Sequence, residues 1–516
     1  MAPPSVAIIG AGFGGLGMAV RLTAAGYRDV TVFEKADDVG GVWRDNTYPG
    51  AECDVPAHLY SFSFAPNPRW TRRFPRQPEI RDYLRACVRR YGLAPHLRLS
   101  TPVRGAAFDE AAGEWRLDLG GGRTHRARVL VSAVGQLGTP ALPDIPGRDS
   151  FAGTAFHSAR WRHDHDLSGR AVAVVGTGAS AIQFVPRIQP LAERLTLFQI
   201  DAPHVLPKGD RPYGPGAAAL FRALPAAQRL SRMRQYWAYE WRAPAFTRWP
   251  ALMSAVDAWA VAHLRSRVAD PGLRRALRPA GPPGCKRILL SDDYYPALER
   301  PNVEVVTSPI TRIGPRGLTT QDGRHHTADT LVYGTGFAAA RFLDGLEVTG
   351  LGGRDLHAAW DGGAEAYLGI TVAGFPNLFL LYGPNTNLGH NSIVHMLESQ
   401  IHYTLECVRL LERRGLRWLD VRPAAQRRFA DWVAERTRAT VFDRGCASWY
   451  RTASGRHTVN WPGSTVSYRL RTRRVRLGDY RLQPRDAPPP GAPGPLGQPH
   501  RPAAPAPPEP APEPRR

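Results

Sequence analysis

Three glycines near the amino terminus have the spacing that brings a backbone against a pyrophosphate. Gly10, Gly12 and Gly15 follow the strand-like run SVAIIG and precede a segment with helical character. In this pattern the glycines permit a tight turn, the approach of the backbone to phosphate, and the packing of helix on strand. Glu34 follows 24 residues after Gly10, at the end of the next expected strand, where a carboxylate can accept hydrogen bonds from a ribose. We therefore predict a dinucleotide site for an unphosphorylated ribose, as in FAD or NAD.

A second loop of the same kind has alanine at the third glycine position. Its residues are Gly176, Thr177, Gly178, Ala179, Ser180 and Ala181. Ile200 stands at the place of Glu34, and Asp201 follows it. Because a carboxylate that would repel a 2′-phosphate is missing at that place, we interpret the loop as a nicotinamide site with some preference for NADP. FAD and a nicotinamide cofactor in one chain indicate hydride transfer to a flavin, and the lack of a C-x-x-C pair disfavours a disulfide reductase.

The two loops belong to two strand–loop–helix–strand units, which predict an α/β fold with two Rossmann-like dinucleotide-binding domains. Segments rich in Trp, Tyr and Arg predict a helical insertion, and the proline-rich end predicts a disordered carboxyl-terminal tail. We expect the FAD-binding domain to consist of two parts, 1–148 and 326–484. The NADP-binding domain would also have two parts, 149–211, which includes a linker, and 284–325. The helical insertion would span 212–283, and the tail 485–516.

The composition restricts the remaining functional classes. The formal net charge of +22 could indicate a nucleic-acid-binding protein, but the arginines are scattered among acidic residues. We therefore expect no nucleic-acid partner, and at most a weak attraction to anionic surfaces. No apolar run is long enough for a transmembrane helix, and a strand-like run near the start leaves no room for a signal peptide. A cytoplasmic protein without a membrane span is the expectation, and the sequence sets no oligomeric state.

The segment FAGTAFHSARWRHD, between the two units, resembles the fingerprint of the Baeyer–Villiger monooxygenases, F-x-G-x-x-x-H-x-x-x-W followed by Pro or Asp. Phe151, Gly153, His157 and Trp161 match it, and Arg162 departs at the last place. Further matches to this family are GGVW, YPGAECDVPAHLYSFSF, KRILLSDDYYPAL, YGPNTNLGHNSI and CASWYR, which together cover most of residues 5–475.

The resemblance implies an activity and a role for the fingerprint. NADPH would reduce FAD, and O2 would add to the reduced flavin as a C4a-peroxide. One oxygen atom would then enter beside the carbonyl of a small-molecule ketone, giving an ester or lactone. The fingerprint segment would act as a hinge between the nucleotide domains rather than in the chemistry.

By the same resemblance, Arg287 and Asp54 form the catalytic pair. A fixed guanidinium stabilises a peroxide anion and then the oxyanion of a tetrahedral adduct, and Asp54 would hold Arg287 through a carboxylate–guanidinium pair. Lys286 would lie against the 2′-phosphate of NADPH. The family usually has an arginine in the region of Ile200 and Asp201 as another phosphate ligand. Its absence predicts a weaker preference for NADPH, with use of NADH.

Other cofactor contacts are implied by the resemblance. Gly41, Val42, Trp43 and Tyr60 would line the flavin, Val103 would touch the adenine, Ile393 the flavin edge, and Trp449 the nicotinamide cofactor. For each aromatic or aliphatic side chain among them, ordinary core packing is the alternative.

Two other functions stay open. In an N- or S-oxygenating flavin-containing monooxygenase, a protonated peroxide attacks a soft nucleophile and Arg287 is not needed. A flavin-bound protein that binds partners without oxygenating would use the basic surface and the proline-rich tail instead.

Overall fold

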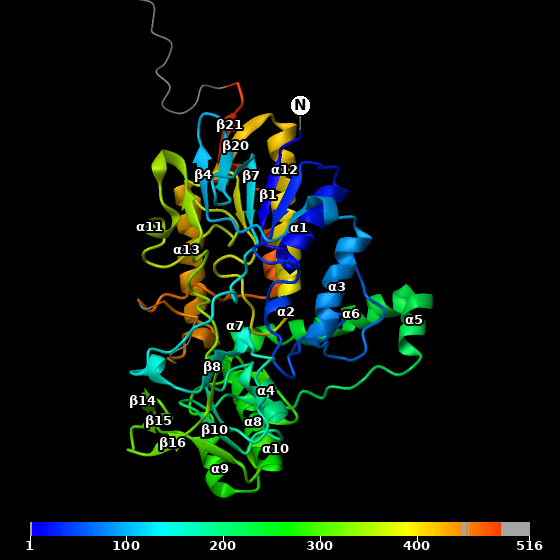
Figure 1. Cartoon of the computed structure of the whole chain (residues 1–516). Coiled ribbons are helices and arrows are strands. Elements are labelled where there is room, and N and C mark those ends of the chain that lie inside the picture. Colours follow the sequence, from blue (N-terminus) through cyan, green and yellow to red (C-terminus); the bar gives the residue numbers. More distant parts are fainter. Residues whose placement is uncertain (1–2, 446–449, 453, 487–516) are drawn as a thin grey trace, which may run out of the picture.

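The computed structural model describes residues 3–445, 450–452 and 454–486, and two parallel sheets form the cores of its two halves (Figure 1). The first sheet has the order β19-β7-β1-β2-β3. Its strands are β1 (Val6–Ile9), β2 (Val30–Phe33), β3 (Leu97–Arg98), β7 (Val129–Ser132) and β19 (Leu378–Leu380). β1 and β7 are buried along their whole length, as apolar parallel strands are when helices and other elements cover both faces.

Two long helices from distant parts of the chain share the core of this first domain. They are α1 (Phe13–Ala24) and α12 (Ile393–Arg413). In α12 the helical spacing of Leu397, Ile401 and Leu405 puts them on one buried face, as the sequence predicts. The other helices of this domain are α2 (Val42–Asp45), α3 (Gln77–Arg90), α11 (Leu356–Ala359), α13 (Pro423–Arg438) and α14 (Thr465–Arg471).

The second sheet carries the second glycine loop and has the order β13-β10-β9-β17-β8. Its strands are β8 (Thr154–His157), β9 (Ala171–Val175), β10 (Arg194–Phe198), β13 (Val303–Val306) and β17 (Thr330–Tyr333). The helices α4 (Ala181–Ile188) and α10 (Tyr294–Leu298) pack into the core beside it. Both predicted Rossmann-like units are therefore present.

The position of β17 corrects the expected boundary between 284–325 and 326–484. β17 pairs in parallel with both β8 and β9, and its Val332 lies opposite Val174. A four-residue apolar strand fits either sheet by composition, so only its pairing decides where it belongs. The second domain therefore extends through Tyr333, and Phe342 is already part of the core of the first domain.

The remaining described strands form four small sheets, β18-β4-β5-β6, β14-β15-β16, β20-β21 and β11-β12. Their bounds are β4 (Gly105–Asp109), β5 (Glu114–Asp118), β6 (Thr124–Ala127), β11 (Val205–Leu206), β12 (Leu289–Leu290), β14 (Ile310–Gly314), β15 (Gly317–Thr320), β16 (His325–Thr327), β18 (Glu347–Thr349), β20 (Leu416–Val421) and β21 (Tyr480–Pro484). β18 pairs in parallel with β4, so the chain rejoins the first domain after its excursion through the second.

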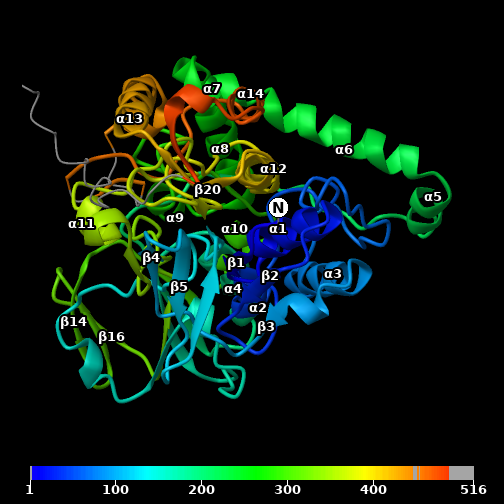
Figure 2. The same cartoon turned by 90° about the horizontal axis from the view of Figure 1, so that it is seen from above.

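Five helices confirm the predicted helical insertion. They are α5 (Ala217–Ala223), α6 (Pro225–Glu240), α7 (Ala243–Thr247), α8 (Met253–Arg267) and α9 (Pro271–Ala276). The insertion divides between the domains, because Tyr239 of α6 packs in the first core and Leu264 of α8 packs in the second. Figure 2 shows α6 along the periphery of the molecule, with α5 at its outer end.

The expected tail, 485–516, lies outside the described residues from 487 onward, as does the predicted nicotinamide contact Trp449. The described part of the chain contains no helix that is both long and apolar enough to cross a membrane.

A buried carboxylate fixes the end of α6 to the first domain. Glu240 is 5% exposed, and its Oε2 accepts hydrogen bonds from Asn391 Nδ2 and Thr465 Oγ1, both at 2.7 Å. Its Oε1 accepts the Val466 N–H at 3.1 Å. Burial alone would raise the Glu240 pKa, but the nearby His390, whose Nε2 lies 3.6 Å from Oε2, and the hydrogen bonds from Thr465 and Val466 together outweigh burial and hold the pKa at about 2. One carboxylate thus joins the insertion to the beginnings of α12 and α14.

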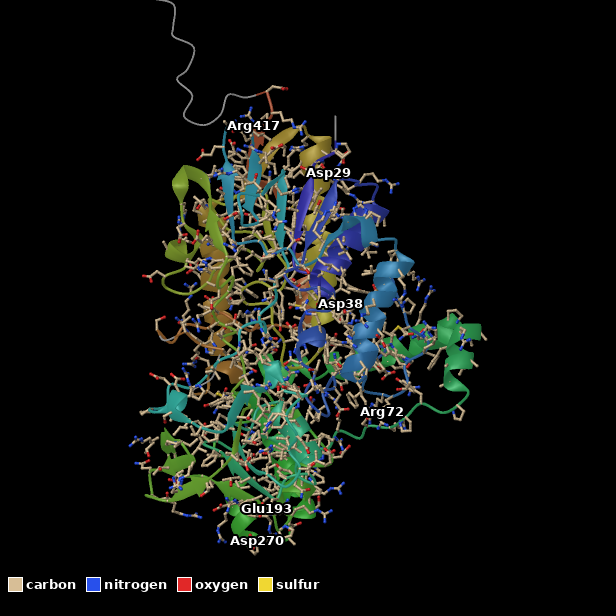
Figure 3. All side chains as sticks on the ribbon, viewed as in Figure 1. Asp29, Asp38, Arg72, Glu193, Asp270 and Arg417 are labelled. Atoms are coloured by element: carbon tan, nitrogen blue, oxygen red, sulfur yellow. The ribbon has the colours of Figure 1, made fainter. Side chains whose placement is uncertain are left out.

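Replacing Glu240 by alanine is expected to lower the free energy of unfolding by about 3 kcal/mol, or ~3 °C in Tm, because three polar groups lose a buried charged partner. Since the pKa of Glu240 in the folded chain lies below its ordinary value, this contribution is present near neutral pH and is lost as the pH falls toward about 2. Thermal unfolding as a function of pH measures both effects. The exposed Glu193, labelled in Figure 3, provides the control, and an equal loss in Glu193→Ala would contradict the anchoring role.

Candidate active site

The glycines of the first loop pack so closely on neighbouring backbone that a side chain would not fit. Gly10 has a φ of 103°, and a Cβ there would lie 2.6 Å from the Ala133 carbonyl oxygen. A Cβ on Gly15 would lie 1.8 Å from the Gly10 oxygen, so α1 packs directly on the turn. Gly12 faces Gly41, which has a φ of 54° and whose Cβ would lie 3.3 Å from the Gly12 Cα. Together with the free N–H groups at the start of α1, this backbone fits the pyrophosphate that the sequence predicts here.

Glu34 follows β2 beside this loop, and its carboxylate is held in place. Its Oε2 accepts the Ala11 N–H at 2.9 Å, and its Oε1 accepts Arg44 Nη1 at 2.9 Å. Burial alone would lower the Arg44 pKa, but the charges and hydrogen bonds of Glu34 and Asp45 together outweigh burial and raise the pKa. Arg44 could not be predicted from the sequence, because its ion pair connects helix α2 to the residue after β2 and leaves no local pattern. The pair fixes the orientation of the carboxylate that would bind the ribose.

Trp43 and Tyr60 contact each other beside Gly41. Trp43 Nε1 donates to the Tyr60 hydroxyl at 3.0 Å, and the two rings meet edge to face with their centroids 5.6 Å apart. Gln77 donates its side-chain amide to the Trp43 carbonyl, and Val42 begins the short helix α2. The structure thus brings the predicted flavin contacts of this region to one side of the first glycine loop.

The second glycine loop packs on neighbouring backbone in the same way as the first. Gly176 has a φ of 102°, and a Cβ there would lie 2.6 Å from the Gly334 carbonyl oxygen, just as Gly10 abuts Ala133. A Cβ on Gly178 would lie 3.6 Å from the same oxygen. In both domains the turn after the first strand therefore packs on the backbone that follows the neighbouring parallel strand, β7 or β17. The contact with Gly334 was not predicted. The feature of the sequence that could have indicated it is the position of Gly334 directly after the strand TLVY.

Asp201 and Lys286 lie together where the 2′-phosphate of a nicotinamide cofactor is expected. Lys286 Nζ lies 2.5 Å from Asp201 Oδ2, and both side chains are about half exposed. Thr177 Oγ1 donates to the Asp201 carbonyl at 3.1 Å, and Ile200 is 82% exposed. The remaining predicted residues of the loop, Ala179, Ser180 and Ala181, lead into α4. The charge of Lys286, the predicted phosphate ligand, is thus partly neutralised by Asp201, which follows β10.

Asp54 and Arg287 form the ion pair that the sequence analysis predicts. Arg287 Nη2 lies 2.8 Å from Asp54 Oδ1 and 2.6 Å from Asp54 Oδ2. Asp54 comes from the first domain, and Arg287 lies two residues before β12, on the side of the second. The Asp54 charge raises the Arg287 pKa above its ordinary value. A permanent cation is therefore held at the junction of the domains, with 44% of its side chain still exposed.

The loop that carries Asp54, residues 48–54, is fixed by the second domain. The Tyr48 hydroxyl donates to Gln183 Oε1 at 3.0 Å, and Gln183 Nε2 donates to the Glu52 carbonyl at 2.9 Å. Lys208 Nζ lies 2.6 Å from Glu52 Oε1 and 5.0 Å from the centroid of the Phe74 ring, with its side chain only 4% exposed. Sequence reasoning missed these partners, although Lys208 is one of three lysines in a chain rich in arginine.

Further contacts connect Lys208 to the segment of Arg287. The N–H groups of Lys208 and Gly209 each donate to the Asp292 carboxylate at 2.9 Å. The next residue, Asp210, accepts Arg72 Nε at 2.7 Å, and Figure 3 labels Arg72 near the junction. The same few residues therefore hold both partners of the Asp54–Arg287 pair.

The other predicted cofactor contacts have ordinary packing in the structure. Ile393 is half-buried at the start of α12, where the Ser392 hydroxyl accepts the Val394 N–H at 3.3 Å. Val103 packs at the edge of a core cluster, shortly after Thr101, whose N–H donates to the Glu34 carbonyl at 2.8 Å. Both contacts remain predictions.

The fingerprint residues lie along the edge strand β8 and its flanking turns; they are Phe151, Gly153, His157 and Trp161. A Cβ on Gly153 would lie 2.2 Å from the Asp329 oxygen. His157 Nδ1 accepts the Ala159 N–H at 3.1 Å, and burial lowers the His157 pKa. Trp161 packs against the core of the second domain. Each residue has a structural contact that fastens β8 and the following turn to this domain.

The two connections between the domains run side by side next to the fingerprint. The Ala141 N–H donates to the Gly336 carbonyl at 2.9 Å, and the His157 ring meets Phe337 edge to face at 5.7 Å. A change of angle between the domains would pass through this pair of connections, which supports the predicted hinge role.

Comparison with known proteins agrees with this arrangement. Residues 8–76 match the family model described as an NAD(P)-binding Rossmann-like domain. The chain is 49% identical to a Baeyer-Villiger monooxygenase of Streptomyces coelicolor, over 92% of both chains. Its structure is similar to that of cyclohexanone monooxygenase from Rhodococcus sp. Phi1 bound to NADP+, with a TM-score of 0.84 and 29% identity over 94% of this chain and 100% of that chain. OTEMO in complex with FAD and NADP matches with a TM-score of 0.84 and 27% identity, over 93% and 100%.

The buried Lys208–Glu52 pair should contribute more to stability than the exposed Lys286–Asp201 pair. Lys208→Met is expected to lower the free energy of unfolding by about 3 kcal/mol, because it leaves the Glu52 carboxylate without its cation. Combining Lys208→Met with Glu52→Gln should recover about 2 kcal/mol of the summed losses in a double-mutant cycle.

Lys286→Met is the matched control, with an expected change of less than about 1 kcal/mol because the pair is exposed. Chemical unfolding of the four Lys208 and Glu52 forms and of this control provides the measurement. If the losses in unfolding free energy of the two single variants simply add in the double variant, Lys208 and Glu52 do not stabilise each other. That result would contradict the proposed role of Lys208 in fixing the 48–54 loop.

Proposed function

Because the chain belongs to the Baeyer–Villiger monooxygenase family, we propose that it uses NADPH and O2 to insert one oxygen atom beside the carbonyl of a ketone. The product is an ester or a lactone. The observation that carries this proposal is the Asp54–Arg287 ion pair between the two dinucleotide-binding domains. Family membership favours this activity over N- or S-oxygenation and over partner binding without oxygenation.

FAD and NADPH are the cofactors that the two glycine loops fit. The first loop, with Gly10, Gly12, Gly15 and Glu34, would hold FAD, and the second, beginning at Gly176, would hold NADPH. In both loops a glycine packs directly on the backbone of another segment, so that a side chain at that position would not fit. FAD, once reduced by NADPH, supplies the activation of O2.

Arg287 contributes a fixed positive charge. Negative charge develops on the ketone oxygen as the carbonyl is attacked, and a preorganised cation stabilises that charge without reorganising at the moment of reaction. Asp54 keeps the guanidinium protonated and oriented, because it engages Nη2 through both carboxylate oxygens. In this proposal the carboxylate of Asp54 positions the guanidinium of Arg287, and the guanidinium stabilises the developing negative charge.

The contact between Lys286 and Asp201 supports a weakened preference for NADPH over NADH. Lys286 would have to leave Asp201 or share its charge in order to bind a 2′-phosphate. The Asp201 carboxylate would also repel that phosphate. NADH carries no such phosphate and avoids both costs.

Replacing Arg287 by alanine is expected to reduce ester formation at least a hundredfold while NADPH still reduces the flavin. Product analysis by gas chromatography and anaerobic stopped-flow absorbance of the flavin measure the two steps separately. Arg265→Ala, an exposed arginine on α8, is the control and should leave both steps unchanged. Ester formation by Arg287→Ala at the wild-type rate would refute the role of Arg287, whereas oxygenation of an amine or sulfide that stays intact in Arg287→Ala would point to an N- or S-oxygenase.

Asp201→Ala is expected to raise the ratio of kcat/KM for NADPH to kcat/KM for NADH by about tenfold, because it frees Lys286 and removes a like charge. Steady-state kinetics with each cofactor measure this ratio, and Asp431→Ala on the exposed side of α13 is the charge-matched control. In the wild-type enzyme the ratio should be below about a thousand. A ratio that does not respond to Asp201→Ala would show that Asp201 does not influence the phosphate site.

A further inference from the structure

Helix α6 has an apolar face that points away from the protein. Leu230, Met233, Trp237 and Trp241 recur every three or four residues and so lie on one side of the helix, which Trp241 extends by one residue in helical conformation. Their exposed fractions are 52%, 52%, 47% and 78%. We call these four residues the outer stripe. An exposed apolar stripe containing two tryptophans indicates a surface that binds something.

The opposite face of α6 packs on the protein through aromatic and polar side chains. Tyr239 is buried in the first core. Gln228 Nε2 donates to the Asn67 carbonyl at 2.6 Å, and Arg232 Nη1 donates to the Ser61 carbonyl at 2.8 Å. A surface helix ordinarily turns its apolar face to the core and its polar face to water. In α6 the buried face includes polar side chains and the outer stripe is apolar, so the exposure of the stripe is not explained by packing within the described residues.

The charge around the outer stripe has one sign. Residues 217–252 contain six arginines, Arg222, Arg229, Arg232, Arg234, Arg242 and Arg248. The one acidic residue of this segment is Glu240, which is buried and accepts hydrogen bonds from three groups. Arg229 and Arg234 are exposed on α6 itself. The surface therefore combines aromatic and aliphatic side chains with positive charge that no exposed acid in the segment compensates.

We propose that the outer stripe binds the surface of an anionic lipid membrane. Helices that lie in a membrane interface have apolar residues with tryptophan on one face and arginine beside it, and each cation near an anionic leaflet adds to the attraction. A second copy of the chain fits the stripe poorly, because its own arginines would face those of the first. The peripheral position of α6 in Figure 2 leaves the helix accessible to an extended surface.

Other large apolar side chains of the insertion are exposed as well. Leu220 and Leu224, in and directly after α5, are each 52% exposed. Trp249 and Leu252, which follow α7, are exposed by 55% and 52%. Exposed large apolar side chains therefore occur before and after the outer stripe in the sequence of the insertion, as well as in the stripe itself.

Co-sedimentation of the FAD-loaded full chain with lipid vesicles tests the proposal. Vesicles of phosphatidylcholine with about one third phosphatidylglycerol should bind at least tenfold more protein than vesicles of phosphatidylcholine alone. The double variant Met233→Glu and Trp241→Glu should lose this binding about tenfold, and so should Arg229→Gln with Arg234→Gln. Circular dichroism confirms that each variant is folded, which is expected because the changed side chains are exposed.

The matched controls lie in the second domain and on α8. Leu191→Glu replaces an apolar residue of equal exposure, and Arg265→Gln with Arg267→Gln removes two exposed arginines. Both should bind vesicles as the wild type does. Equal binding of all variants, or no preference for the anionic vesicles, would overturn the proposal. A wild-type dimer that the Met233 and Trp241 variant converts to a monomer, measured by analytical ultracentrifugation, would instead assign the stripe to a second copy of the chain.

Discussion

The ion pair between Asp54 and Arg287 joins two separate domains, so the geometry of the proposed active site is set by the junction between them. Asp54 lies on a loop of the first domain, but Gln183 and Lys208 of the second domain hold that loop. Lys208 is in turn held through its backbone by Asp292, five residues after Arg287. A cation fixed in this way does not have to rearrange in order to stabilise a developing anion. This preorganisation is the main source of electrostatic catalysis.

The two halves of the molecule use the same local solution for two different cofactors. In each, a glycine after the first strand packs against the carbonyl that follows the neighbouring parallel strand. The differences lie in charge. The first loop has Glu34, oriented by Arg44, and the second has Asp201, paired with Lys286. The helical insertion is fastened between these halves by the buried carboxylate of Glu240, and its outer face is left free for a role outside the reaction.

The sequence predicted the local parts of this architecture well. Glycine spacing located both loops, and the family resemblance identified the Asp54–Arg287 pair. What escaped prediction was non-local: the partners of Glu52, the pairing of Arg44 with Glu34, and the sheet to which β17 belongs. A short apolar strand such as TLVY is equally suited to either sheet, and a buried ion pair depends on residues far apart in the chain. The exposure of the outer stripe of α6 also became visible only once the neighbours of the helix were known.

We propose that Asp54 positions Arg287 so that activated oxygen reaches a ketone instead of being lost as hydrogen peroxide. The amount of ester formed per NADPH consumed by Asp54→Asn tests this role, because the substitution keeps the size of the side chain and removes its charge. NADPH oxidation should continue while hydrogen peroxide replaces most of the ester. An unchanged yield of ester per NADPH would show that the carboxylate does not position the guanidinium.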